Sequence, residues 1–246
     1  RADTMTKAFA STYGEKFNAS GSWTGKELHQ AIQEYEKIDE LLGKLVSYGY
    51  LLFATNVNNP PVLQFFQMIQ EQSTTISSHL IFFTLDLNKL EEAALKNAYG
   101  GSSELARYRP GSDGVRLVRP HQLSAELEKL LHEKSVTGRN AWIRLFDETL
   151  ASIKFTIDGQ EFALAQVLDR VAHKDASVRH EAAQALSKGL AQNASLLTLI
   201  TNTLAKDKEI EDSWRQFSHP VAARNLSNQV EDEVVNALVK AVKESY

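Results

Sequence analysis

Two His-Glu pairs are the residues of this chain whose types and spacing come closest to a catalytic motif. In a zinc-peptidase helix, His-Glu-x-x-His places two metal-binding imidazoles one turn apart, beside a glutamate that activates a water molecule. The two pairs, each with the residue that stands in place of the second histidine, are His132-Glu133 with Val136 and His180-Glu181 with Gln184. Zinc sites use three or four protein ligands, so one imidazole cannot replace the pair. We therefore predict that both histidines are exposed polar helix residues, and we assign no catalytic or metal-binding residue in the chain.

The remaining histidines show no metal-ligand spacing either. They are His29, His79, His121, His173 and His219. His121 follows Arg119 and Pro120, a pattern typical of the entry to a helix, where a ring nitrogen can satisfy a backbone group. We therefore predict a structural role for His121.

The composition excludes several other classes of function. Cysteine is absent, which rules out disulfides, thiolate metal sites and a cysteine nucleophile. The net charge of −4 gives no basic footprint for nucleic acid. No apolar run approaches the roughly 18–20 residues that span a bilayer, and the first residues lack the layout of a signal peptide. We therefore expect a cytoplasmic protein that binds neither nucleic acid nor membrane.

The first half of the chain has the pattern of two long helices. Thr24-x-x-Glu27 is a capping box, which marks a helix start. After it, apolar residues recur every three or four positions from Leu28 to Leu45, and again from Leu63 to Leu80. Asn58-Asn59-Pro60-Pro61 separates the two patterns. Two long helices joined by a short breaker predict an antiparallel helical hairpin.

The middle of the chain mixes turn signals with helical patterns. Gly100-Gly101 and the run Pro110-Gly111-Ser112-Asp113-Gly114 are strong turn signals, so we expect residues 98–118 to be irregular. Helices are predicted around Glu126–His132 and Arg139–Ala151.

The second half predicts one β-hairpin followed by helices. Apolar residues alternate on both sides of Asp158-Gly159, which is a strong hairpin signal for the region 153–164. From Leu164 onward the pattern is helical again. A long helix is expected as far as Leu204, and Asp175 caps its start. A last helix is expected from Val230 to the end of the chain. The predicted fold is therefore mainly α, with long antiparallel helical hairpins and a bundle, and one short β-hairpin near 153–164.

Three blocks of sequence resemble the N-terminal lobe of oligoendopeptidase F, a zinc metallopeptidase of the thimet oligopeptidase clan. The first runs from Arg119-Pro120-His121-Gln122-Leu123-Ser124 to Asp147, through Glu126, Leu130-Leu131, Glu133-Lys134, Thr137-Gly138, Ala141-Trp142 and Leu145-Phe146. The second is Asn202-Thr203-Leu204-Ala205-Lys206-Asp207 with Asp212-x-Trp214-Arg215, and the third is Asn225-x-x-Asn228-x-Val230-x-x-x-Val234. The resemblance implies an all-α lobe that forms one wall of a channel for short unfolded peptides. We accordingly divide the chain into a helical hairpin region, 1–118, and an oligopeptidase-F-type helical domain, 119–246, which continues into an absent catalytic lobe.

The resemblance also implies what this chain lacks. In the parent zinc endopeptidase, a hydrolase, the Zn²⁺ ligands and the general base lie in the C-terminal catalytic lobe, which would be the partner of this segment. None of them can be placed on a residue here, so no cofactor is expected in the segment and we predict that it is inactive alone. Its substrate-binding residues stay unassigned. The alternative is a non-enzymatic helical interaction module, because Asp175-x-x-Val178-Arg179 is similar to half of a HEAT repeat. A solenoid needs about three or more repeats, and the sequence shows no second copy.

Overall fold

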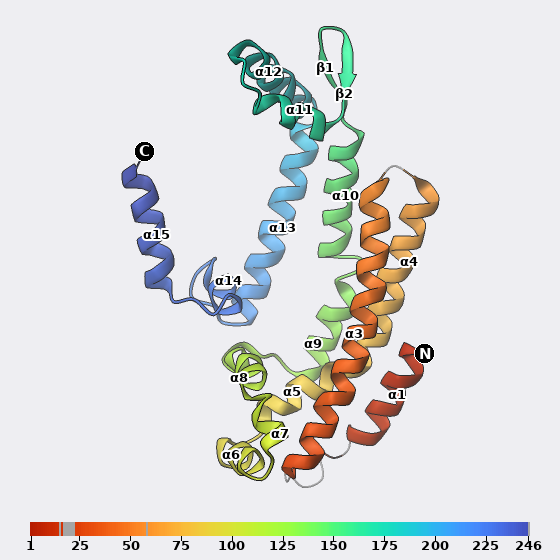
Figure 1. Ribbon diagram of the computed structural model, residues 1–246, viewed down its shortest axis with the longest axis vertical. Helices are drawn as coiled ribbons and strands as arrows, with labels where there is room; N and C mark the ends of the chain where they lie inside the picture. Colours follow the sequence, from red (N-terminus) through yellow and green to blue (C-terminus); the bar gives the residue numbers. More distant parts are fainter. Residues whose placement is uncertain (15, 17–22, 58, 246) are drawn as a thin grey trace. The chain divides into compact units, whose positions relative to one another are not determined.

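The computed structural model describes residues 1–14, 16, 23–57 and 59–245, which form helices joined by short connections and one two-stranded sheet (Figure 1). The helices are α1 Ala2–Tyr13, α3 Gly25–Thr55, α4 Pro60–Ser77, α5 Ile81–Lys89, α6 Glu92–Gly100, α7 Ser103–Ala106, α8 Arg109–Leu117, α9 Ala125–Lys134, α10 Arg139–Ser152, α11 Leu164–Val171, α12 Ala176–Gln192, α13 Ala194–Trp214, α14 Ala222–Ser227 and α15 Asp232–Ser245. Short 3-10 helices cover Ser78–Leu80 and Arg119–His121, and the strands are β1 Phe155–Ile157 and β2 Gln160–Phe162. The predicted fold class, mainly α with one short β-hairpin, is confirmed.

Two compact units make up the chain, and each is assembled from separate stretches. The first unit contains Arg1–Val46, Glu71–Glu133 and Glu209–Tyr246, and the second contains Ser47–Gln70 and Lys134–Lys208. The predicted domains, 1–118 and 119–246, divide the chain at a single point in the sequence. Each observed unit combines several separate stretches, so the units do not test that division and it stays a prediction.

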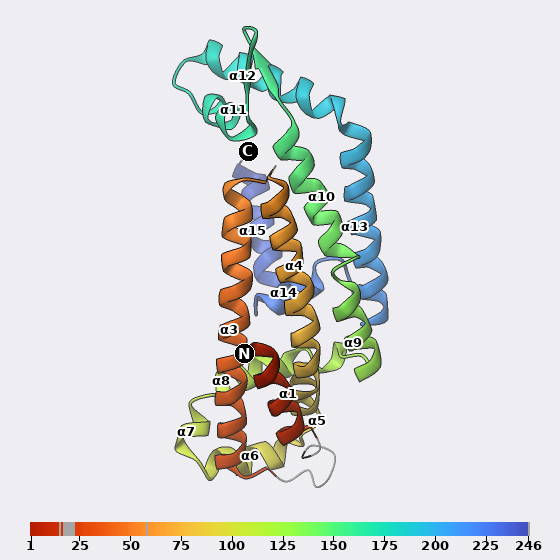
Figure 2. The same cartoon turned by 90° about the vertical axis from the view of Figure 1, so that its right-hand side faces the viewer.

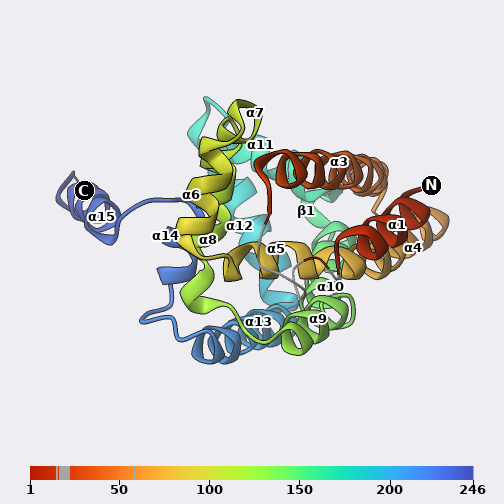
Figure 3. The same cartoon turned by 90° about the horizontal axis from the view of Figure 1, so that it is seen from below.

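The first unit is built around aromatic side chains of α1 and their neighbours. Phe9 is only 2% exposed, and its ring centroid lies 4.8 Å from that of Tyr13 and 5.2 Å from that of Phe83. Leu28 on α3 is fully buried in the same core. Figure 3 shows α1 lying beside α3. Burial of such large side chains from water is the main stabilising term of the unit.

The predicted capping box at the start of α3 is confirmed. The amide of Glu27 donates to the hydroxyl oxygen of Thr24 (3.2 Å), and the amide of Thr24 donates to the Glu27 carboxylate (3.2 Å). Lys16 also donates to this carboxylate at 2.6 Å. The hydrogen bonds from Lys16 and then from Thr24 lower the pKa of Glu27 to about 2. The Glu27 carboxylate is therefore charged at neutral pH, and a negative charge at a helix start is favourable.

The hairpin predicted from the Asn-Pro breaker is also found. α3 ends at Thr55 and α4 begins at Pro60, where proline fits the first helical turn. In the second unit the end of α3 packs against the start of α4, with the rings of Phe53 and Phe66 stacked at 4.9 Å. Gly49 faces this packing, and a Cβ there would make an ordinary contact of 3.4 Å with Phe66 and Ile69. Figure 2 shows the two helices running side by side.

The expectation that residues 98–118 are irregular is wrong for most of that region. The Gly100-Gly101 pair does end α6, but the Pro-Gly-Ser-Asp-Gly run lies inside α8. Pro110 occupies the first turn, where its missing N–H has no helical partner to lose. Arg116 of α8 donates to the carbonyl oxygens of Leu87 (3.1 Å) and Leu90 (2.9 Å), at the end of α5. This tertiary contact outweighs the weak helix propensity of the two glycines.

The β-hairpin forms where the sequence predicts it. Phe155 pairs with Phe162 in an antiparallel register, and the turn residues Asp158 and Gly159 have φ of 50° and 77°. Two positive φ angles are the requirement of a type I′ turn, which the Asp-Gly pair meets. The strand side chains Phe155 and Val167 of the following helix are both fully buried in the core of the second unit.

The single long helix expected between Asp175 and Leu204 is instead two helices. Asp175 does cap the first, α12, by accepting a hydrogen bond from the amide of Ser177 (2.9 Å). α12 ends at Gln192, and Asn193 alone connects it to α13, with φ −109° and ψ 10°. The Asn193 side chain donates to the carbonyl oxygen of Gly189 at 3.3 Å. An asparagine side chain can take a backbone hydrogen bond that would otherwise continue the helix. The helix therefore breaks at Asn193, although the spacing of apolar residues continues on both sides.

We expect Gly189→Ala to lower the free energy of unfolding by about 1–3 kcal/mol, the usual range for overpacking a core. A Cβ at Gly189 would lie 2.6 Å from Cδ1 and 2.7 Å from Cε1 of the buried Phe155 ring. The matched control is Gly43→Ala in α3, where a Cβ would meet nothing within 4 Å. That change should stabilise the protein by about 0.5–1 kcal/mol, since alanine is the better helix former. Urea unfolding measures both, and equal effects would contradict the packing described here.

Candidate functional site

Residues from two of the sequence blocks meet in the first unit. Arg215 follows α13 and Glu128 lies on α9. The Arg215 guanidinium donates from Nη1 to Oε1 of Glu128 at 2.7 Å and from Nη2 to Oε2 at 2.9 Å. Such a two-point pairing is stronger and more directional than a single contact. The residues are 87 positions apart in sequence, so the pair joins two distant segments.

Backbone groups complete this cluster. Arg215 Nη1 also donates to the carbonyl oxygen of His121 (3.2 Å), and the amide of Leu123 donates to Glu128 Oε1 (2.9 Å). His121 Nδ1 lies 2.7 Å from the carbonyl oxygen of Arg215, so Nδ1 is the protonated nitrogen. The His121 ring stacks on Phe217 with centroids 3.9 Å apart. We name this cluster the Arg215 clasp; its members are His121, Leu123, Glu128, Arg215 and Phe217. The structural role predicted for His121 is confirmed.

The electrostatics of the clasp favour a permanently charged pair. Burial of Glu128 opposes its ionisation, but hydrogen bonds from Arg215 and from the amide of Leu123 outweigh it and lower the pKa of Glu128. The hydrogen bond to Glu128 raises the pKa of Arg215 above its usual value. The side chains of Arg215 and Glu128 are 19% and 16% exposed. Because both groups stay ionised near neutral pH and are already paired, the clasp is suited to holding segments together and not to proton transfer.

The two near-miss histidines of the sequence have different surroundings. His132 is half-buried, which corrects the expectation that it is exposed; its Nε2 lies 2.8 Å from the hydroxyl of Ser77 and 3.3 Å from the carbonyl oxygen of Thr74. The end of α4 covers this ring. His180 is exposed as expected, and its Nε2 lies 2.9 Å from Nε2 of Gln184, the residue at the place of a second histidine. An amide therefore occupies the position from which a second imidazole would bind a metal.

Among the residues that the structure describes, no group of three or more histidine, aspartate or glutamate side chains is placed to hold a metal ion. Neither near-miss pair gains a third ligand by convergence in space. The donor set of these residues thus does not fit zinc.

The third sequence block forms another local contact. The Asn225 amide donates to Asp232 Oδ1 at 2.6 Å, and Nε2 of His219 lies 2.7 Å from Asp232 Oδ2. The hydrogen bonds from Asn225 and then from His219 lower the pKa of Asp232. Asp232 is the first residue of α15, where a negative charge is also favoured by the helix dipole. The block therefore fixes the start of α15.

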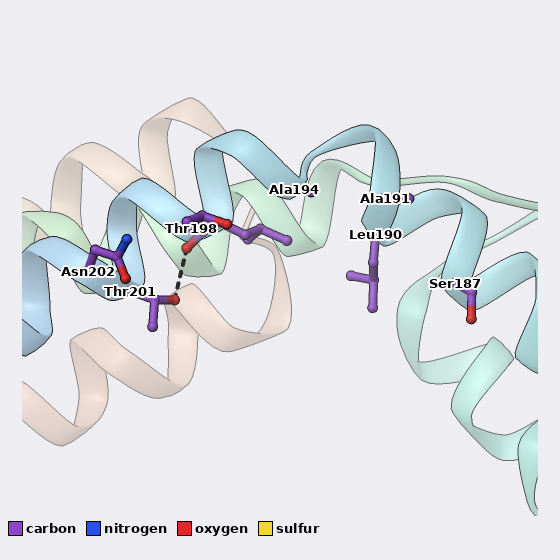
Figure 4. A pocket seen from close by; sticks show the side chains of 8 residues that line it. Ser187, Leu190, Ala191, Ala194, Thr198, Thr201 and Asn202 are labelled. Atoms are coloured by element: carbon purple, nitrogen blue, oxygen red, sulfur yellow. Dashed lines mark hydrogen bonds between the residues drawn. The ribbon is translucent and has the colours of Figure 1, made fainter.

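An open depression of about 630 Å³ lies in the second unit at the bend between α12 and α13 (Figure 4). Its lining is Ser187, Leu190, Ala191, Ala194, Leu197, Thr198, Thr201 and Asn202. Half-buried Leu190 and Leu197 are its apolar part, and the hydroxyl and amide side chains are exposed. No sequence motif marks this place. A signal was present, however, because no charged residue occurs between Lys188 and Lys206.

One helix of the first unit presents an uncovered apolar face. No residue of α15 is buried. Its exposed apolar residues, at helical spacing, are Val234 (54%), Leu238 (65%), Val239 (46%) and Val242 (48%). Contiguous exposed apolar patches occur at surfaces that contact other proteins, membranes or ligands. In the described part of the chain, no helix combines the length and hydropathy needed to cross a bilayer.

Comparisons with known proteins identify what this architecture is similar to. Residues 86–155 match the N-terminal family model of M3 peptidases, described as Oligopeptidase F. The fold matches oligoendopeptidase-F from Enterococcus faecium with a TM-score of 0.83 and 17% identity, over 98% of this chain and 47% of that chain. It also matches a putative peptidase from Chlamydophila abortus with a TM-score of 0.63 and 15% identity, over 98% of this chain and 42% of that one. No curated protein matches.

The comparisons confirm the resemblance read from the sequence blocks. The matched stretch contains the first part of the signature, including His121 and Glu128 of the clasp. The structural likeness, at 17% and 15% identity, concerns the fold. The chain spans less than half the length of both solved chains.

Proposed function

We propose that this chain is the N-terminal, channel-forming lobe of a cytoplasmic zinc-dependent oligoendopeptidase that hydrolyses short peptides. The observation that carries the proposal is the match of nearly the whole chain to less than half of an oligoendopeptidase-F, together with the family match over residues 86–155. The described residues do not fit a zinc ion, so the metal ligands and general base would belong to a C-terminal lobe. When bound there, zinc would supply an activated water for attack on a peptide carbonyl.

The residues of this chain would support catalysis by position alone. The Arg215 clasp ties the 3-10 helix Arg119–His121 and α9 to the end of α13, which keeps the wall contributed by the first unit in one arrangement. A rigid wall confines a short peptide and excludes folded proteins. The uncovered face of α15 supports the presence of a further lobe, because a helix with no buried residue needs a partner for its apolar stripe.

We expect Leu238→Glu to weaken binding between this chain and the separately expressed C-terminal part of the same reading frame by at least about tenfold, because a buried unpaired charge disfavours association. Leu238 is the most exposed of the large apolar residues of α15, at 65%. The control is Asn236→Glu, which adds the same charge at an exposed position of the same helix outside the apolar stripe. Isothermal titration calorimetry measures both. Equal binding by wild type and Leu238→Glu would contradict the docking of a lobe on α15. A complete reading frame without His-Glu-x-x-His would favour a helical interaction module instead.

A further inference from the structure

The depression between α12 and α13 is lined by uncharged side chains of both helices. Its volume is about 630 Å³, and it is wide open to solvent. Lining residues at positions 194, 197, 198, 201 and 202 recur at helical spacing, so they share one face of α13. Positions 187, 190 and 191 share one face of α12. The one-residue connection at Asn193 brings these two faces next to each other, so both line the same open depression.

The polar groups of this surface are exposed, and most of them bond to no other described residue. The Thr201 hydroxyl donates to the carbonyl oxygen of Leu197 at 2.8 Å. In contrast, the side chains of Ser187, Thr198 and Asn202 have no hydrogen-bond partner among the described residues of the protein. Hydroxyl and amide groups both donate and accept, as the backbone of an extended peptide requires. Leu190 and Leu197 offer the apolar contact for a side chain between them.

The absence of charge restricts which peptides this surface suits. All eight lining residues are uncharged, in a chain of which 24% of residues are charged. A charged side chain placed there would lose water without gaining a counter-charge.

We propose that this depression, formed by one face of α12 and one face of α13, binds an uncharged stretch of an extended peptide, with Thr198 and Asn202 bonding its backbone. The inference rests on the proposed function and names the substrate class that this lobe favours.

Fluorescence anisotropy of three labelled nine-residue peptides tests the proposal with the chain itself. One probe contains only Ala, Leu, Ser, Thr and Gly, and two analogues carry a single central Lys or Asp. The uncharged probe should bind at least about tenfold more tightly than either analogue, a difference of about 1.4 kcal/mol. Thr198→Asp should weaken the uncharged probe about tenfold and make the Lys analogue the tighter ligand. Leu199→Asp, an exposed position on the same helix outside the depression, is the control and should change neither affinity.

Equal affinity for all three probes, or equal effects of Thr198→Asp and Leu199→Asp, would overturn the inference. Circular dichroism of each variant confirms that it is folded. Failure here is separable from failure of the proposed function. Chelator-sensitive hydrolysis by the complete protein without Thr198-dependent binding overturns this inference alone, whereas Thr198-dependent binding without any hydrolysis overturns the proposed function alone.

Discussion

Glu128→Gln is expected to lower the free energy of unfolding by about 2–4 kcal/mol, slightly below the usual cost of breaking a fully buried ion pair because both side chains retain some exposure. The substitution preserves shape but removes the charge that Arg215 pairs with at 2.7 and 2.9 Å. Arg215 is only 19% exposed, so its guanidinium would be left partly desolvated without a counter-charge. Chemical denaturation of the two proteins measures the difference.

The matched control removes the other partner of the same arginine. Glu211 accepts a single hydrogen bond from Nε of Arg215 at 2.8 Å, but its side chain is 45% exposed. Glu211→Gln should therefore cost no more than about 0.5 kcal/mol, as exposed pairs do. If Glu128→Gln and Glu211→Gln were equally mild, the clasp would not be what holds α9 to the end of α13.

The stability difference between wild type and Glu128→Gln should also depend on pH. Hydrogen bonds in the folded state lower the pKa of Glu128 below its ordinary value of 4.5. A lowered pKa in the folded state contributes stability that is fully present above the unfolded value and is lost as pH falls through the folded value. The difference should thus be constant from pH 7 to about pH 5 and shrink below about pH 4.5. A difference that grows on acidification would contradict the charged pairing.

Phe155→Ala should lower the free energy of unfolding by about 3–5 kcal/mol, the usual loss for truncating a buried aromatic residue. Phe155 is 0% exposed at the centre of the core of the second unit, between Ile153, Ile157, Val167 and Ala182. Its ring rests on Gly189, where no side chain could move in to fill the cavity. The core cannot collapse easily, so the loss should lie toward the upper end.

Phe162 is the matched control for this truncation. It pairs with Phe155 across the hairpin, but it is only half-buried and its ring carries the Arg170 guanidinium at 4.5 Å. Phe162→Ala should cost about 1–2 kcal/mol, mainly through lost apolar burial and the cation–π contact. Hydrogen exchange should show the larger loss of protection for Phe155→Ala in α11 and α12. Equal losses for the two variants would mean that Phe155 is not central to this core.

Local sequence signals predicted the parts of the fold that depend on neighbouring residues. The capping box at Thr24, the break before Pro60 and the Asp158-Gly159 turn each act within a few residues, and the structure contains all three. The signals failed at two places for different reasons. Arg116 bonds to the distant end of α5 and allows a helix through two glycines. Asn193 makes a local bond that interrupts the helix while the apolar pattern continues on both sides.

The sites show the same division between local and distant causes. His121 could be assigned a structural role from its neighbours Arg119 and Pro120. Its partners Arg215 and Phe217 could not be found, because a pairing across 94 residues leaves no periodic trace in one sequence. The depression at the bend was missed because it depends on the break at Asn193, although the charge-free run around it was visible.

Hydrolysis of a fluorogenic short peptide by two purified proteins tests the central claim most directly. One is this 246-residue chain, and the other is the product of the complete reading frame that contains it. The proposal predicts no hydrolysis by the chain alone, and hydrolysis by the longer protein that a chelator abolishes and zinc restores. Chelator-sensitive hydrolysis by the chain alone, or a longer protein that cleaves no peptide with zinc present, would contradict it.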